Sequence, residues 1–274
     1  MDRQDIAYVI NTTPKYFYLL PLHLTLLFRY AGPKFKWPVF IGTEEPDHLI
    51  LQHIKKTWPQ VTILPIPLEQ EAFLESRAET LRLLPSTIEY ILPIQEDFLL
   101  EARPLDHVLK GALEIFDESS SVASMRLMPC PGPAGKTTWD TSYWKILEFG
   151  TDSFIFSYQA TIWRREPYQM FLDDVLNAIN IFHAKQLPLT PKQKVFLQIQ
   201  MNLAEIDFGQ KSLQELSRVN NWIHLAWPRE GPQPNAVYLS PWPYRPTAVV
   251  KGKLEDWAVD LAAREGVPLE PSLR

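Results

Sequence analysis

This 274-residue sequence has a single cysteine and only 10 glycines. One cysteine, Cys130, excludes an intrachain disulfide, which is typical of a reducing compartment, and we expect a cytoplasmic location. Neither of the glycine-rich phosphate motifs, G-x-G-x-x-G and G-x-x-x-x-G-K-[ST], occurs. Segment 132–137, GPAGKT, lacks the required spacing and a preceding strand, so we interpret it as a surface loop.

Long hydrophobic runs and an excess of basic charge are also missing. The apolar stretch Tyr16–Phe28 covers 13 residues without a charge, whereas a membrane span needs roughly 20. We therefore expect no transmembrane segment and no secretory signal, which leaves peripheral membrane contact open. The formal net charge of −5 gives no reason to expect a nucleic-acid partner.

The first hundred residues alternate between short apolar runs and helical patterns. Buried parallel strands read as continuous apolar runs, and alternation with helices is typical of a parallel sheet with crossover helices. In such sheets ligands bind outside the carboxyl ends of the strands. We predict strands at 6–10, 37–42, 61–64 and 90–94, and helices at 16–30, 47–58 (capped by Asp47) and 69–84.

The remainder of the chain has a less regular pattern. We predict helices at 103–118, 167–180, 192–204 and 254–265, a strand at 122–128, a strand or hairpin at 153–163, and an ordered loop at 227–247. The Pro/Gly-rich loop 129–141 is the candidate hinge. We therefore expect one α/β domain over 1–274, with halves at 1–130 and 131–274.

The fourth predicted strand ends in two adjacent carboxylates, Glu96 and Asp97. Carboxylates at the carboxyl end of a buried strand face the crevice, where they can hold a hard cation such as Mg²⁺ or Mn²⁺ that shares its ligands with substrate phosphates. The alternative interpretation is a helix-capping pair at a surface turn.

The end of the fourth predicted strand resembles a sequence motif of a known protein family. The segment Glu89–Asp97, EYILPIQED, is similar to the metal-binding D-x-D segment of GT-A-fold glycosyltransferases. The resemblance implies a Rossmann-like, mainly parallel central sheet flanked by helices, with a mixed C-terminal half that binds the acceptor. It also implies a nucleotide-diphosphate sugar donor, a glycan or other hydroxyl acceptor, and Mn²⁺ or Mg²⁺ as cofactor.

The resemblance also assigns roles to individual residues. It implies that Asp97 binds the metal and that a carboxylate near residue 205 acts as the catalytic base. The expected catalytic residues are Glu205, then Asp207 and Asp152. The expected nucleotide-sugar contacts are Asn11, Thr12, Thr13, Tyr16, Arg77, Gln95, Glu96, Gln159 and Trp163.

The sequence departs from the family pattern at three points. Gln95 replaces the first acid of D-x-D, Ile206 separates Glu205 from Asp207, and no asparagine follows Arg77. Two alternatives stay open. One is a non-catalytic interaction protein with the same fold, which Gln95 favours. The other is a different sugar-nucleotide enzyme such as a nucleotidyltransferase, although the glycine-rich basic signature that such enzymes usually carry near the N-terminus is missing here.

Overall fold

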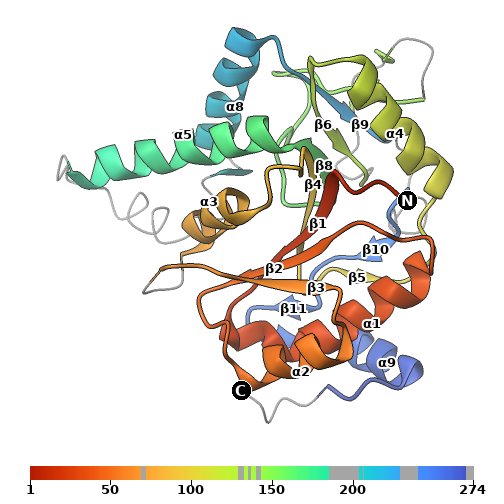
Figure 1. The fold of residues 1–274 in the computed structure, drawn as a ribbon. Helices are drawn as coiled ribbons and strands as arrows, with labels where there is room; N and C mark the ends of the chain where they lie inside the picture. Colours follow the sequence, from red (N-terminus) through yellow and green to blue (C-terminus); the bar gives the residue numbers. More distant parts are fainter. Residues whose placement is uncertain are drawn as a thin grey trace.

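The computed structural model describes residues 1–68, 72–128, 133–134, 137–139, 143–184, 204–205, 207–228 and 240–269. Across these residues runs an eight-stranded sheet with the order β3-β2-β1-β4-β8-β6-β9-β7 (Figure 1). Its strands are β1 (Ile6–Asn11), β2 (Val39–Thr43), β3 (Val61–Pro65), β4 (Tyr90–Gln95), β6 (Val122–Arg126), β7 (Lys145–Ile146), β8 (Thr161–Arg164) and β9 (Ile223–Ala226).

The sheet is parallel in its first half and mixed in its second. β1 pairs in parallel with β2 and β4, and β2 with β3. β8 runs antiparallel to both of its neighbours, β4 and β6. β9 is parallel to β6 and antiparallel to β7. The predicted α/β fold with a mainly parallel sheet and a mixed C-terminal half is confirmed.

Helices cover both faces of the sheet, because the strand side chains alternate between two apolar layers. From β1, Ile6, Tyr8 and Ile10 enter one layer, and Ala7 and Val9 enter the other. The first layer packs against α1 (Leu20–Ala31), α2 (Leu49–Thr57), α4 (Asp106–Glu118) and α9 (Asp256–Glu265); the second packs against α3 (Phe73–Leu83), α5 (Arg165–Ala184) and α8 (Asp207–Asn220).

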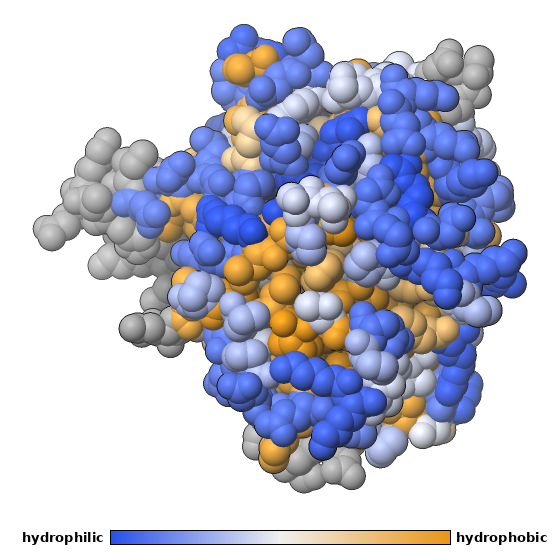
Figure 2. Space-filling view, viewed as in Figure 1, coloured by the Kyte–Doolittle hydropathy of each residue, from blue (hydrophilic) through white to orange (hydrophobic). Residues whose placement is uncertain are grey.

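Shorter elements close the lower part of the molecule in Figure 1. The 3₁₀ helix η1 (Pro14–Leu19) leads into α1, β5 (Leu99–Leu100) pairs with β10 (Tyr244–Arg245), and β11 (Val249–Val250) pairs with β12 (Lys253–Leu254). Figure 2 shows hydrophobic residues gathered in the middle of this face, around the β3 edge of the sheet, with hydrophilic residues above and below. No helix of the described ranges is long and apolar enough to span a membrane.

Several predicted boundaries differ from the structure. The helix expected from Tyr16 begins as the 3₁₀ turn η1, and α2 is capped by the side chain of His48, not by Asp47. Of the strand or hairpin predicted at 153–163, only 161–163 belongs to a strand (β8), since Phe156 and Tyr158 fill the core without strand pairing. α8 and β9 were not predicted. The helix expected at 192–204 and the hinge at 129–141 lie mostly outside the described residues.

Candidate functional site

The carboxyl ends of β1, β2 and β4 lie side by side at one edge of the sheet. The strand register places Asn11 opposite Gly42 on one side and opposite Gln95 on the other. Polar residues follow directly on each strand: Thr12 and Thr13 after β1, Glu44 after β2, and Glu96 and Asp97 after β4. The shared edge follows from the parallel pairing of these three strands.

Helix α3 is fixed against this edge by a close approach that requires glycine. The Asn11 amide donates to the Thr80 hydroxyl at 2.6 Å and to the Ser76 carbonyl at 3.2 Å. A Cβ on Gly42 would lie 2.1 Å from the Thr80 hydroxyl, so no larger residue fits without displacing the helix. Asn11 therefore anchors α3, the helix that carries Arg77.

Arg77 is a buried cation, with 7% of its surface exposed. Its guanidinium donates to the Phe73 carbonyl at 2.9 Å and lies 3.5 Å from the centre of the Phe73 ring and 5.3 Å from that of Tyr158. Within the described residues it forms no salt bridge with a carboxylate. Because arginine is almost never buried without a partner, this guanidinium marks a place suited to an anion.

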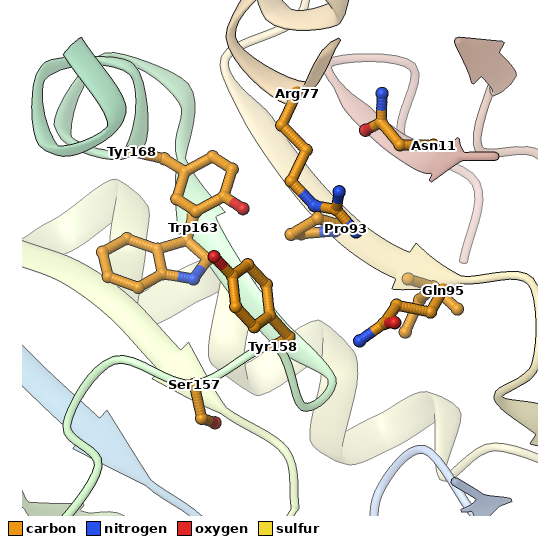
Figure 3. A pocket seen from close by; sticks show the side chains of 9 residues that line it. Asn11, Arg77, Pro93, Gln95, Ser157, Tyr158, Trp163 and Tyr168 are labelled. Carbon is orange, nitrogen blue, oxygen red and sulfur yellow. The ribbon is translucent and has the colours of Figure 1, made fainter. Parts of the chain in front are cut away.

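A small cavity lies beside the guanidinium. Figure 3 shows Arg77 reaching into the space between Tyr158 and Tyr168 on one side and Pro93 and Gln95 on the other. The cavity holds about 10 Å³ accessible to water, roughly the room for one molecule. Its walls come from β1, α3, β4, β8, α5 and segment 157–158: Asn11, Arg77, Pro93, Ile94, Gln95, Ser157, Tyr158, Trp163 and Tyr168.

Glu96 and Asp97 do not line this cavity. Burial raises the pKa of Glu96 to about 8, and the neighbouring Asp97 carboxylate adds to the shift. Burial also raises the pKa of Asp97 to about 6. Asp97 Oδ2 accepts from the Val249 amide at 3.4 Å, and the Asp97 carbonyl accepts from the Ala248 amide at 3.0 Å. The structure thus turns the Asp97 carboxylate toward β11.

A buried histidine supports the turn that carries these acids. His23 Nδ1 lies 3.0 Å from the Glu96 carbonyl oxygen, and His23 Nε2 lies 2.7 Å from the Tyr8 hydroxyl. Burial lowers the pKa of His23 to about 4, so the ring is neutral at pH 7. Because a carbonyl only accepts, Nδ1 carries the proton and the Tyr8 hydroxyl donates to Nε2.

Buried polar atoms without a partner gather at the same edge. In the described part of the chain, four of them follow the strand ends: Thr12 Oγ1, Thr13 Oγ1, Glu44 Oε2 and Asp97 Oδ1. Each such atom costs about 1–3 kcal/mol if it stays unpaired. Their concentration at one edge is what a binding site for a polar ligand requires. Tyr16, half-buried beside them, has the Lys15 ammonium 5.1 Å from its ring centre.

The candidate base Glu205 lies behind segment 157–158. Its Oε1 accepts from the Tyr158 amide at 2.7 Å, and burial raises its pKa. With Asp152 it lines a second cavity, of about 370 Å³. The carboxylate of Asp152 accepts from the backbone amides of Glu148 and Ala134. Asp207 begins α8, and its side chain lies outside the described part.

The remaining predicted contacts divide between the core and the cavity. Trp163, 1% exposed, lines the small cavity. The Gln159 side chain accepts from the Tyr244 hydroxyl instead of facing the cavity. Three further residues of the cavity wall were not predicted as site residues: Ser157, Tyr158 and Tyr168. Their aromatic and small side chains carry no signal that separates a cavity wall from a core position.

No protein-family model and no curated protein sequence matches the chain. Structural neighbours are GT-A glycosyltransferases, matched at a low level of similarity. Residues 1–349 of S. aureus TarS in complex with UDP-GlcNAc match 64% of this chain and 48% of that one, with 17% identity and a TM-score of 0.41.

Two further neighbours extend this comparison. Mannosyltransferase PcManGT from Pyrobaculum calidifontis, in complex with GDP-Man and Mn²⁺, matches 61% of this chain and 46% of that one, with 15% identity and a TM-score of 0.41. The bifunctional glycosyltransferase WbbM matches 63% and 34%, with 10% identity and a TM-score of 0.42. The chain thus spans about half or less of the length of these neighbours.

Proposed function

We propose that this chain binds a nucleoside-diphosphate sugar at the carboxyl ends of β1, β2 and β4 and transfers the sugar to a hydroxyl acceptor. The observation that carries the proposal is the buried guanidinium of Arg77, which has no carboxylate partner in the described residues, together with the four unpartnered polar atoms at the strand ends. We further propose that the single domain divides its work, with 1–130 binding the donor and 131–274 the acceptor.

Arg77 is the residue suited to the leaving group. Breaking the bond between the sugar and the diphosphate leaves additional negative charge on the phosphates. A buried guanidinium would stabilise that charge by charge-assisted hydrogen bonds, which are about twice as strong as neutral ones. Thr12, Thr13 and Tyr16 then lie where the nucleoside would bind, and Gln95 and Trp163 where the sugar would bind.

We further propose that a divalent cation binds together with the diphosphate. No group of three metal-ligating side chains occurs in the described residues. Mg²⁺ and Mn²⁺ nevertheless bind through one or two carboxylates when phosphates and waters complete the shell, and the buried, unpartnered Asp97 Oδ1 is such a ligand. Asp97, with Glu96 beside it, would hold the ion, which would supply neutralisation of the diphosphate charge.

Glu205 is our first choice for the base that takes the acceptor proton, ahead of Asp207. Its raised pKa brings a carboxylate closer to the operating pH, and general-base catalysis contributes about 10²–10⁴-fold. Asp152 is our third choice, because both of its oxygens already accept from backbone amides and stabilise the loop that contains it.

Binding of a sugar nucleotide requires the small cavity to open. Ligand sites of this kind measure about 300–1,000 Å³, far above the 10 Å³ observed. Most of its walls are strands and helices, whereas Ser157 and Tyr158 belong to a segment without regular structure. Segment 157–158 is therefore the wall that we expect to move.

A protein that keeps the fold without the reaction is the second candidate. The closed cavity favours it, together with the amide of Gln95 at a position where the family pattern has an acid. Such a protein would not respond to sugar nucleotides at all.

A thermal-shift screen separates the two candidates. UDP-, GDP- and CDP-sugars are added to the whole chain with Mn²⁺ or with EDTA. We expect one nucleotide class to raise the melting temperature, and Asp97→Asn to lose the part of the rise that depends on Mn²⁺. Asp260→Asn, at an exposed position of α9, serves as the matched control. If no nucleotide shifts the melting temperature under either condition, the proposed transferase function is refuted.

A further inference from the structure

The second cavity has the size of a small-molecule site and lies apart from the cavity beside Arg77. It holds about 370 Å³, within the usual range for such sites. It opens between the loop 148–155 and helix α8, and its walls include Phe149, Phe154, Glu205, Lys211 and Gln214. No side chain of the described residues fills this cavity, and two phenylalanines, Phe149 and Phe154, line it.

Phe154 is displayed at this cavity in a strained conformation. Its φ is 54° and 43% of its surface is exposed. A positive φ is a genuine outlier for a bulky residue and costs about 1–3 kcal/mol, so it persists only where the surroundings enforce it. Here the fully buried Arg126 donates to the Phe154 carbonyl at 2.7 Å. The chain thus holds a large aromatic side chain in solvent at an energetic cost.

The loop before Phe154 is fixed by its own hydrogen bonds. The Glu148 carbonyl accepts from the amides of Thr151 and Asp152, at 3.1 and 2.8 Å, and Asp152 Oδ2 accepts from the Glu148 amide at 2.8 Å. A loop tied in this way presents its next residues in one orientation. The ring of Phe154 is therefore preorganised, which lowers the entropic cost of binding a ligand.

Helix α8 supplies the polar side of the cavity. The Gln210 side chain donates to the Phe156 carbonyl at 2.9 Å, which joins the helix to the loop. Lys211 and Gln214 are exposed and three residues apart, so they lie on the same side of the helix. They offer an ammonium and an amide to a ligand that stacks on Phe154.

We propose that this cavity binds a neutral pyranose unit of a carbohydrate acceptor, with one face of the sugar ring on Phe154 and its hydroxyls toward Lys211 and Gln214. A pyranose has an apolar C–H face and a rim of hydroxyls, which match an exposed aromatic ring beside amide and ammonium groups. The walls carry both signs of charge, with Lys211 on one side and Asp152 and Glu205 on the other, and thus do not favour an anionic sugar.

Glu205 connects this cavity to the proposed reaction. It lines the carbohydrate cavity, while its Oε1 accepts from the amide of Tyr158, whose side chain lines the cavity beside Arg77. A hydroxyl bound on Phe154 would therefore lie in the cavity that the candidate base lines. The role as acceptor site rests on the proposed function; the binding of a pyranose does not.

Saturation-transfer NMR with the methyl glycosides of glucose, galactose, mannose and N-acetylglucosamine tests the inference. We expect at least one glycoside to bind the wild-type chain and Phe154→Gly to weaken it about tenfold, the loss of about 1.4 kcal/mol of stacking. Phe154→Gly should melt no lower than the wild type, because glycine adopts a φ of 54° without strain. Phe154→Tyr should retain binding.

The controls separate this inference from the proposed function. Tyr143→Ala removes another exposed aromatic residue, outside the cavity, and should leave glycoside binding unchanged. If no glycoside binds the wild type, or if Phe154→Gly binds as well as the wild type, the carbohydrate site is refuted. The nucleotide response measured on the same samples shows independently whether the donor site stands.

Discussion

Replacing Arg77 by methionine tests whether this guanidinium is kept for a ligand. Arg77→Met removes a charged hydrogen bond to the Phe73 carbonyl, worth about 1.5–3 kcal/mol, and a contact with the Phe73 ring, worth about 0.5–2 kcal/mol. It also removes the desolvation cost of a buried cation, which is several kcal/mol. Because these contributions oppose each other, we expect the free energy of unfolding to change by less than about 1 kcal/mol.

The same change should weaken nucleotide binding strongly. Loss of one charge-assisted hydrogen bond, about 1.5–3 kcal/mol, lowers affinity by roughly 10- to 150-fold. Urea denaturation gives the first quantity and calorimetric titration with UDP or GDP the second. Arg82→Met is the matched control: it lies on the same helix, but is exposed and paired with Glu79 and Asp173. A loss of stability above about 3 kcal/mol with unchanged nucleotide affinity would show that Arg77 only supports the fold.

Two further predictions concern the core. Burial lowers the pKa of His224 from 6.5 to about 3, so the unfolded chain binds a proton that the folded chain excludes. The free energy of unfolding should then fall as the pH drops below about 6.5, by about 2 kcal/mol at pH 5. The urea midpoints measured at pH 7 and pH 5 should therefore differ less in His224→Gln than in the wild type. An equal difference in both proteins would contradict the lowered pKa of His224. Gly42→Ala places a Cβ against Thr80 and should cost about 1–3 kcal/mol, seen as a lower melting temperature; an unchanged value would show that α3 adjusts freely.

The first half of the sheet could be predicted from sequence because its pattern is local. Each of β1 to β4 is a short apolar run next to a helical pattern, and the observed strands begin or end within two residues of the predicted ranges. The second half could not be predicted in this way. β9 has only four residues, Ile223–Ala226, and in segment 153–160 aromatic content indicated burial, whereas the positive φ of Phe154 is incompatible with a strand.

The candidate site shows the same division between local and distant information. The meeting of Asn11 with Gln95 follows from parallel strands, and the position of Arg77 from the helix that precedes the fourth strand. The contact of Asp97 with Val249 joins residues 152 positions apart, and no pattern near either residue indicates it. The same holds for Tyr158 and Tyr168, which reach the cavity from the irregular segment before β8 and from α5.

The two cavities are mechanically connected through one residue. Tyr158 presents its side chain to the cavity beside Arg77, while its backbone amide donates to Glu205 at the border of the carbohydrate cavity. If a donor binds beside Arg77 as we propose, we expect it to displace segment 157–158, because the existing space holds about one water molecule. That displacement either moves the Glu205 carboxylate along with the amide or breaks their hydrogen bond and frees an oxygen of the base. In both cases binding of the proposed donor would change the surroundings of Glu205, so we expect the donor to alter the affinity of the carbohydrate cavity for its sugar.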